Sequence, residues 1–199
     1  MDVRASNQTR EINCKGGEAL RVALKHRDKY TQNHCERVVK IAIKTGEYFD
    51  FDKESLFQLA IAAKFHDIGK IGIPDRILFN PGKLTVEEYS EMKAHSAIGA
   101  NIVKKLDIPN ADNIAEIILH HHEHFDGSGY PNGLRGKEIS LSSRIISVID
   151  AFDALCSHRL YRKPTSSEKA LTIMANEMAG QFDPSIYNVV SKVIEDHSF

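Results

Sequence analysis

The sequence predicts an all-α fold, a compact bundle of about seven or eight helices. Apolar residues recur at spacings of three and four along most of the 199-residue chain, and no segment alternates convincingly as a strand would. A hydrophobic content of 42% supplies enough side chains for one core. Residues 1–17 are polar, so we expect a loose lead-in followed by a single domain over 18–199.

The first half of the chain is predicted to contain four helices. Asp52 is a suitable N-cap for the third helix. Thr85 and Glu88 have the spacing of a capping box, which marks the start of the fourth. Glycines and a proline in "IGKIGIP" separate these two helices. The predicted helices cover about 18–29, 31–49, 53–67 and 85–102.

Four more helices are predicted in the second half. A loop over 125–140 precedes the last three, and loops of this length are usually functional or disordered. Thr165 and Glu168 suggest a further capping box, Gly180 a C-cap, and Asp183 the N-cap of the last helix. The predicted helices cover about 112–124, 140–155, 165–180 and 182–196.

Composition excludes several classes of protein. The formal net charge is -1, which argues against a generally basic protein that binds DNA or RNA polymers. No apolar run is long enough for a secretory signal or a membrane span. The cysteines are odd in number and form no CxxC, so we expect a reducing cytoplasm rather than disulfides or zinc. They are Cys14, Cys35 and Cys156.

Several histidines lie on the apolar faces of predicted helices. Four of the ten fall within residues 120–124, and others follow apolar residues at spacings of three or four. A buried carboxylate beside buried imidazoles is costly unless something pairs with it, and a metal ion is a suitable partner. Histidine and aspartate without cysteine favour octahedral iron or manganese. The inward-facing set is His34, His66, His95, His121 and Asp150.

Each of these residues also has a simpler interpretation. A single histidine on an apolar face is more often a hydrogen-bonded core residue, Asp67 could cap a turn, and Asp150 could pair with Arg144. The joint pattern favours metal binding because separate helices bring these groups to one depth. Adjacent His121 and His122 would differ by about 100° on a helix, so they would reach neighbouring ions or two sides of one ion. His120 and His124, which flank this pair, are expected to face outward or to support the ligands.

Two motifs then identify a family. "HDIGKIGIPD" and "HHEHFDGSGYP" closely resemble the HD-GYP family, a branch of the HD-domain metal-dependent phosphohydrolases. The resemblance covers about residues 27–187 and implies an HD-domain helical fold, with 18–199 as the catalytic domain. It also implies hydrolysis of cyclic di-GMP, a bacterial second messenger, to linear pGpG by a metal-bridging hydroxide. Two divalent ions, iron or manganese, are the implied cofactors.

The resemblance assigns roles by motif position. Asp67 and Lys70 are the implied catalytic residues, and Lys70 also contacts a substrate phosphate. Tyr130 belongs to the GYP loop and could stack on a base, with Tyr161 as a competitor. The implied metal ligands are His34, His66, Asp67, His95, His121, His122 and Asp150, and the further substrate contacts are Asp153, Arg159 and Arg162.

One position departs from the family. Members that hold a third ion have a glutamate one turn before the first-helix histidine, whereas this chain has Tyr30 four residues before His34. A neutral phenol is a poor ligand for a hard divalent ion. We therefore expect two ions, and linear pGpG as the main product with slow or no further cleavage to GMP.

Alternatives for substrate and partners stay open. Another cyclic dinucleotide, such as cyclic GMP-AMP, would require the same chemistry, and a non-catalytic adaptor would bind the dinucleotide without turnover. Possible partners are diguanylate cyclase domains or a separate regulatory protein, and a homodimer is a possible assembly. Most family members carry an N-terminal regulatory domain. Only about 25 residues precede the first matching helix here, so the chain is a stand-alone protein or part of a longer one.

Overall fold

The computed structural model describes residues 15–27, 29–157, 164–178 and 180–197. Over these residues every regular element is helical, which confirms the all-α prediction. Beyond the predicted helices, the structure adds the single turn α5 and two short 3-10 helices, η1 and η2. The elements are α2 (Lys15–Arg27), α3 (Lys29–Tyr48), α4 (Lys53–Phe65), η1 (Ile68–Gly72), α5 (Asp75–Leu78), α6 (Val86–Val103), α7 (Ala111–Leu119), η2 (Gly136–Glu138), α8 (Leu141–Cys156), α9 (Ser167–Glu177) and α10 (Pro184–His197).

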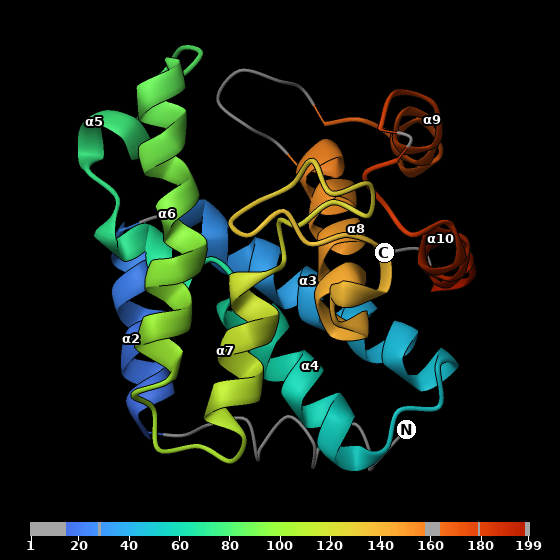
Figure 1. The fold of residues 1–199 in the computed structure, drawn as a ribbon, viewed down its shortest axis with the longest axis horizontal. Helices are drawn as coiled ribbons and strands as arrows, with labels where there is room; N and C mark the ends of the chain where they lie inside the picture. Colours follow the sequence, from blue (N-terminus) through green and yellow to red (C-terminus); the bar gives the residue numbers. More distant parts are fainter. Residues whose placement is uncertain (1–14, 28, 158–163, 179, 198–199) are drawn as a thin grey trace.

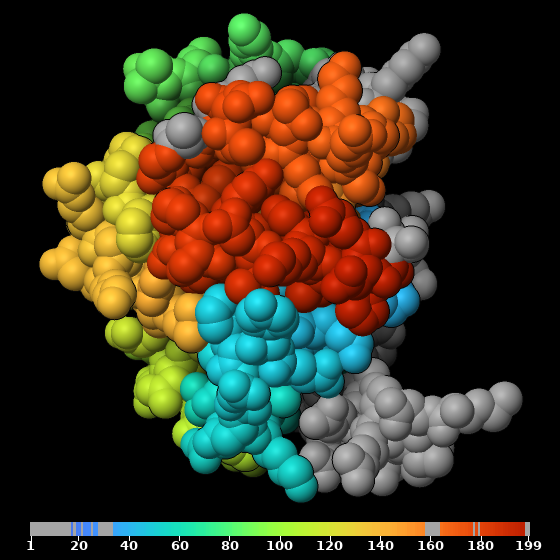
Figure 2. Space-filling model, turned by 90° about the vertical axis from the view of Figure 1, so that its right-hand side faces the viewer, coloured from blue at the N-terminus to red at the C-terminus, as the bar shows by residue number. Residues whose placement is uncertain are grey.

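The helices surround one apolar core. α3 packs on α4 and α8, while α6 packs on η1 and α7 (Figure 1). The C-terminal helices α9 and α10 cover the outer side of this bundle, above the end of α3 and the start of α4 (Figure 2). Fully buried isoleucines on α3, α4, α7 and α8 fill the centre, and each stabilises the fold by about 1.5–3 kcal/mol. They include Ile41, Ile61, Ile118 and Ile149.

Local capping explains the start of several helices. The Asp52 side chain accepts the Ser55 N–H at 2.8 Å, and Thr85 and Glu88 form the predicted capping box. The capping box predicted at Thr165 is wrong, because Ser166 caps α9 instead. The Thr165 N–H is used elsewhere, in a 3.2 Å hydrogen bond to the Leu155 carbonyl of α8.

The helix predicted over 112–124 ends earlier, at Leu119. The next residues form turns, and Glu123 is buried with its carboxylate accepting the N–H groups of Asn132 (2.7 Å) and Leu134 (3.0 Å). These contacts fold the 125–140 loop back over the end of α7. The expected 100° separation of His121 and His122 on a helix is therefore wrong, and their ring centroids lie 3.9 Å apart.

Across the described ranges, we find no helix with the length and apolar character needed to span a membrane.

Candidate metal centre

The structure brings together all seven residues that the sequence suggested as metal ligands. They are supplied by α3, the C-terminal end of α4, α6, the turn after α7, and α8. In that order they are His34, His66, Asp67, His95, His121, His122 and Asp150.

Close backbone packing sets the position of the His66–Asp67 pair. α4 ends at Phe65, and η1 then passes directly against α6. A Cβ on Gly69 would overlap the carbonyl oxygen of His95, so only glycine allows this approach. The glycine of "HDIGK" therefore places the end of α4 beside a histidine of α6.

His34, His66 and Asp150 form what we name the first cluster. One ligand atom from each lies within 4.8 Å of the other two. The His34 Nε2 atom is 3.1 Å from His66 Nε2 and 3.2 Å from Asp150 Oδ1. Asp150 does not take the alternative partner Arg144, which instead pairs with Asp183.

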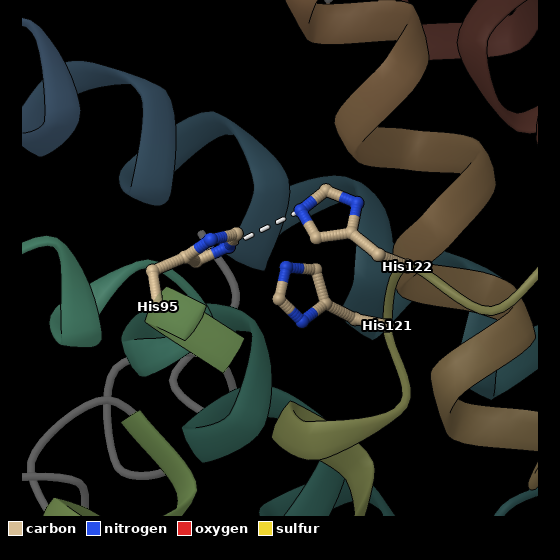
Figure 3. A group of neighbouring side chains, drawn as sticks. All are labelled: His95, His121 and His122. Atoms are coloured by element: carbon tan, nitrogen blue, oxygen red, sulfur yellow. Dashed lines mark hydrogen bonds between the residues drawn. The ribbon is translucent and has the colours of Figure 1, made fainter. Parts of the chain in front are cut away.

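His95, His121 and His122 form the second cluster. Their rings point toward one another from α6 and from the turn after α7, and His95 Nε2 lies 3.2 Å from His122 Nε2 (Figure 3). The Nε2 atom of His121 is buried and has no hydrogen-bond partner. A buried imidazole nitrogen in this condition is costly unless a ligand occupies its lone pair.

Asp67 lies between the two clusters. Its Oδ2 atom is 3.6 Å from His66 Nε2 and 3.8 Å from His34 Nε2, while its Oδ1 atom is 3.8 Å from His95 Nε2. Each oxygen therefore faces a different cluster. A carboxylate in this position can contribute one oxygen to each of two ions.

Hydrogen bonds at Nδ1 orient three of the imidazole rings. His66, His95 and His121 each have Nδ1 within 2.6–2.8 Å of the backbone carbonyl three residues earlier. A carbonyl only accepts hydrogen bonds, so Nδ1 carries the proton and the Nε2 lone pair faces the cluster. This arrangement is typical of histidines that bind metal ions.

The electrostatics of the second cluster also suit a cation. Burial lowers the pKa of His95, lowers that of His121 well below its usual value, and lowers that of His122 to about 3. These imidazoles are neutral near pH 7, so their lone pairs are available to bind a metal ion. Each cluster has the donor atoms to hold a divalent metal ion.

Around the first cluster, charged and hydrogen-bonding neighbours outweigh the effect of burial on the pKa values. Burial alone would lower the pKa of His34, but hydrogen bonds with Asp150 and Asp153 raise it to about 9. Burial would raise the pKa of Asp67, but Lys70 and His66 hold it well below its usual range. Asp67 is therefore ionised at neutral pH and offers both oxygens.

Asp153 occupies a different place from the substrate contact that we expected. It is buried, and it accepts hydrogen bonds from His34 Nδ1 (2.7 Å), from the Arg37 guanidinium and from Ser157 Oγ (2.9 Å). It therefore lies behind the His34 ring, on the side away from the clusters, and orients it. We missed Arg37 in the sequence, although its spacing of three from His34 places both on one helix face.

Lys70 lies beside Asp67, one turn further along in η1. Its Nζ atom is 2.6 Å from Asp67 Oδ2, and about a quarter of its side chain (26%) is exposed. The ammonium group thus lies next to the clusters, on a side chain that is partly exposed to solvent. This position is compatible with a contact to a substrate phosphate.

The GYP loop is built onto the second cluster. The Tyr130 ring stacks on the His122 ring with centroids 4.9 Å apart. The backbone N–H of Tyr130 donates a hydrogen bond to the backbone carbonyl of His122 at 3.1 Å. A Cβ on Gly129 would overlap the backbone of His124, so this glycine is required for the close approach. His120, expected to face outward or to support the ligands, is buried beside Asn132. The loop therefore holds His122 in place from the outer side.

Some predicted residues are not part of the described structure. Arg159, Tyr161 and Arg162 lie outside the described residues, so their expected substrate contacts stay predictions. His124 is described, and its Nδ1 atom lies 2.9 Å from Ser128 Oγ within the loop.

Comparisons with known proteins identify the family. The family model described as "HD domain" matches residues 18–186. A cyclic di-GMP phosphodiesterase of Thermotoga maritima is 40% identical over 176 residues, which are 88% of this chain and 48% of that protein. The 3'3'-cGAMP-specific phosphodiesterase 3 of Vibrio cholerae is 38% identical over 165 residues, which are 83% of this chain and 35% of that protein.

The fold comparison gives the same architecture. Bd1817, a HDG"Y"P protein from Bdellovibrio bacteriovorus, superimposes with a TM-score of 0.68 at 20% identity, over 84% of this chain and 53% of that one. The matched residues span about half the length of the Thermotoga maritima protein and about a third of the Vibrio cholerae protein. The chain belongs to the HD domain family and, by its HD and GYP motifs, to the HD-GYP branch of that family.

Proposed function

We propose that this chain is a metal-dependent phosphodiesterase that hydrolyses cyclic di-GMP to linear pGpG. The observation that carries the proposal is the position of Asp67, with one oxygen toward each of two clusters of metal-binding side chains. When bound, two adjacent divalent ions supply a water of lowered pKa and neutralise phosphoryl oxygens. The similarity to a cyclic di-GMP phosphodiesterase of Thermotoga maritima supports this substrate.

The residues of the chain would position the reacting groups. His34, His66 and Asp150 would hold one ion, the second cluster would hold the other, and Asp67 would join them. Lys70 would stabilise negative charge on a non-bridging phosphate oxygen, because its ammonium group is next to Asp67 and partly exposed. Tyr130 would keep His122 in place, and Asp153 would do the same for His34.

We infer two ions, iron or manganese, rather than three. Tyr30 stands one turn before His34 on α3, where family members that hold a third ion have a carboxylate. With two ions, linear pGpG would accumulate and further cleavage to GMP would be slow.

The absence of a disulfide pattern in the sequence supports a site of action in the bacterial cytoplasm.

A second candidate substrate is cyclic GMP-AMP. A relative of similar identity, from Vibrio cholerae, is named for 3'3'-cGAMP. The metal centre acts on the phosphodiester bond, which both dinucleotides share. Preference between them therefore depends on contacts to the bases.

Changing Lys70 to alanine is expected to leave the metal content intact while kcat falls by about a hundredfold, the usual cost of losing one charge-stabilising donor. Metal analysis of the purified variant and steady-state kinetics measure these two quantities. Lys83→Ala, at an exposed loop position, is a matched control that should retain full activity. Loss of metal from the Lys70 variant would instead assign this lysine a structural role.

The substrate can be tested directly. Protein loaded with iron or manganese is incubated with cyclic di-GMP or with cyclic GMP-AMP, and the products are separated by chromatography. We expect linear pGpG to form in a metal-dependent reaction that a chelator stops. Binding of the dinucleotide without any product would support the non-catalytic adaptor instead.

A further inference from the structure

Aromatic side chains extend from the second cluster to the surface of α6. The Tyr130 ring stacks on His122 with an interplanar angle of 29°. Tyr89 then meets Tyr130 edge-on, with centroids 6.5 Å apart and an angle of 82°. This series connects the metal-binding side chains to an exposed position on α6, the helix that also carries His95.

Exposure increases along this series. His122 and Tyr130 are half-buried, whereas Tyr89 at the outer end is 51% exposed. An aromatic ring left so open contributes little to the core of the bundle. Tyr89 therefore presents an accessible ring surface within two aromatic contacts of a metal-binding histidine.

A positive charge accompanies the two tyrosines. Lys93 lies one turn after Tyr89 on α6, and its Nζ atom is 5.5 Å from the centre of the Tyr89 ring and 5.7 Å from that of Tyr130. Tyr130 already has His122 against its ring, which leaves it less available for stacking on a ligand. Tyr89 and Lys93 therefore offer an exposed ring with an ammonium group over it.

We propose that Tyr89 and Lys93 form an outer subsite for the cyclic dinucleotide, a proposal that rests on the function proposed above. Tyr89 stacks on one purine base, and Lys93 contacts the phosphate that is away from the metal centre. Aromatic rings stack on any base, and a lysine ammonium is a point charge suited to phosphate. Tyr89 and His95 are separated by about 9 Å along α6, which keeps the subsite close to the second cluster.

Substitutions on α6 separate binding from chemistry. Tyr89→Ala is expected to raise KM for cyclic di-GMP roughly tenfold with kcat unchanged, because it removes one base–aromatic stack. Tyr89→Phe keeps the ring and should restore the wild-type KM.

Lys93→Met keeps the aliphatic stem of the side chain and removes its charge. It should raise KM and make KM less sensitive to salt. Val86→Ser, one turn before Tyr89 at a position that is 81% exposed, is the matched control and should leave KM unchanged.

A binding measurement gives a readout that is independent of turnover. Cyclic di-GMP is titrated calorimetrically into metal-free protein, and Tyr89→Ala is expected to bind roughly tenfold more weakly than wild type or Tyr89→Phe. Equal affinity and equal KM for wild type and Tyr89→Ala would overturn the subsite and leave the α6 surface as a candidate protein contact. An equal loss from Val86→Ser would also overturn it. If metal-loaded wild type neither binds nor hydrolyses a cyclic dinucleotide, the proposed function itself fails, and the subsite with it.

Discussion

Asp67→Ala is expected to remove metal binding and turnover together while the helical bundle still folds. The Asp67 carboxylate is buried between the two clusters, and its oxygens lie 3.6–3.8 Å from histidine nitrogens of both. Without Asp67 no carboxylate joins the two clusters. The second cluster also loses the negative charge that lies 3.8 Å from His95 Nε2. Because metal assistance is worth several kcal/mol, we expect turnover to fall about a thousandfold or more.

Metal analysis, circular dichroism and product chromatography measure the three consequences of this change. Asp67→Asn keeps the shape of the side chain and should lose metal to a similar extent, because the charge is required. Asp107→Ala removes an exposed carboxylate between α6 and α7 and serves as the control for loss of charge. Turnover near the wild-type rate in the Asp67 variants would refute the bridging role.

Gly69→Ala is expected to destabilise the protein and to weaken the metal centre at the same time. The added Cβ would overlap the His95 carbonyl and closely approach the Gly99 nitrogen, and backbone atoms cannot rotate away as a side chain can. Separating η1 from α6 would cost about 1–3 kcal/mol in the free energy of unfolding. It would also move His66 and Asp67 away from His95.

Denaturant unfolding and a metal titration test this pair of effects. Gly82→Ala is the matched control, because its Cβ would meet only the Asn80 side chain, at an ordinary distance of 3.4 Å. That control should keep both the unfolding midpoint and the metal affinity. An unchanged midpoint for Gly69→Ala would mean that the contact between η1 and α6 can relax without cost.

Much of the fold and the ligand set could be predicted because both depend on spacing along single helices. The spacing of His34 from Val38, and of Asp150 from Ile146, places each polar group on the buried face of its own helix. Recognition of the HD and GYP motifs then added the residues that helical spacing does not select, such as Asp67. The structure brings these groups together as that pattern implied.

Features that depend on contacts between distant segments were not predictable in this way. α7 ends at Leu119 because Glu123 is held by backbone groups nine and eleven residues later, and helical periodicity carries no signal for this. Asp153 lies one turn after Asp150, and the family resemblance implied a substrate contact for it. Its burial against Arg37 and His34 appears only once α3 and α8 are packed together.

Anomalous scattering from crystals grown with iron or manganese tests most directly whether Asp67 joins two metal ions. Data collected at the absorption edge of the metal locate each ion independently of any activity. We predict two peaks, one at His34, His66 and Asp150 and the other at His95, His121 and His122, with an oxygen of Asp67 next to each. A third peak at full occupancy would contradict the two-ion centre, and peaks remote from Asp67 would contradict the bridging carboxylate.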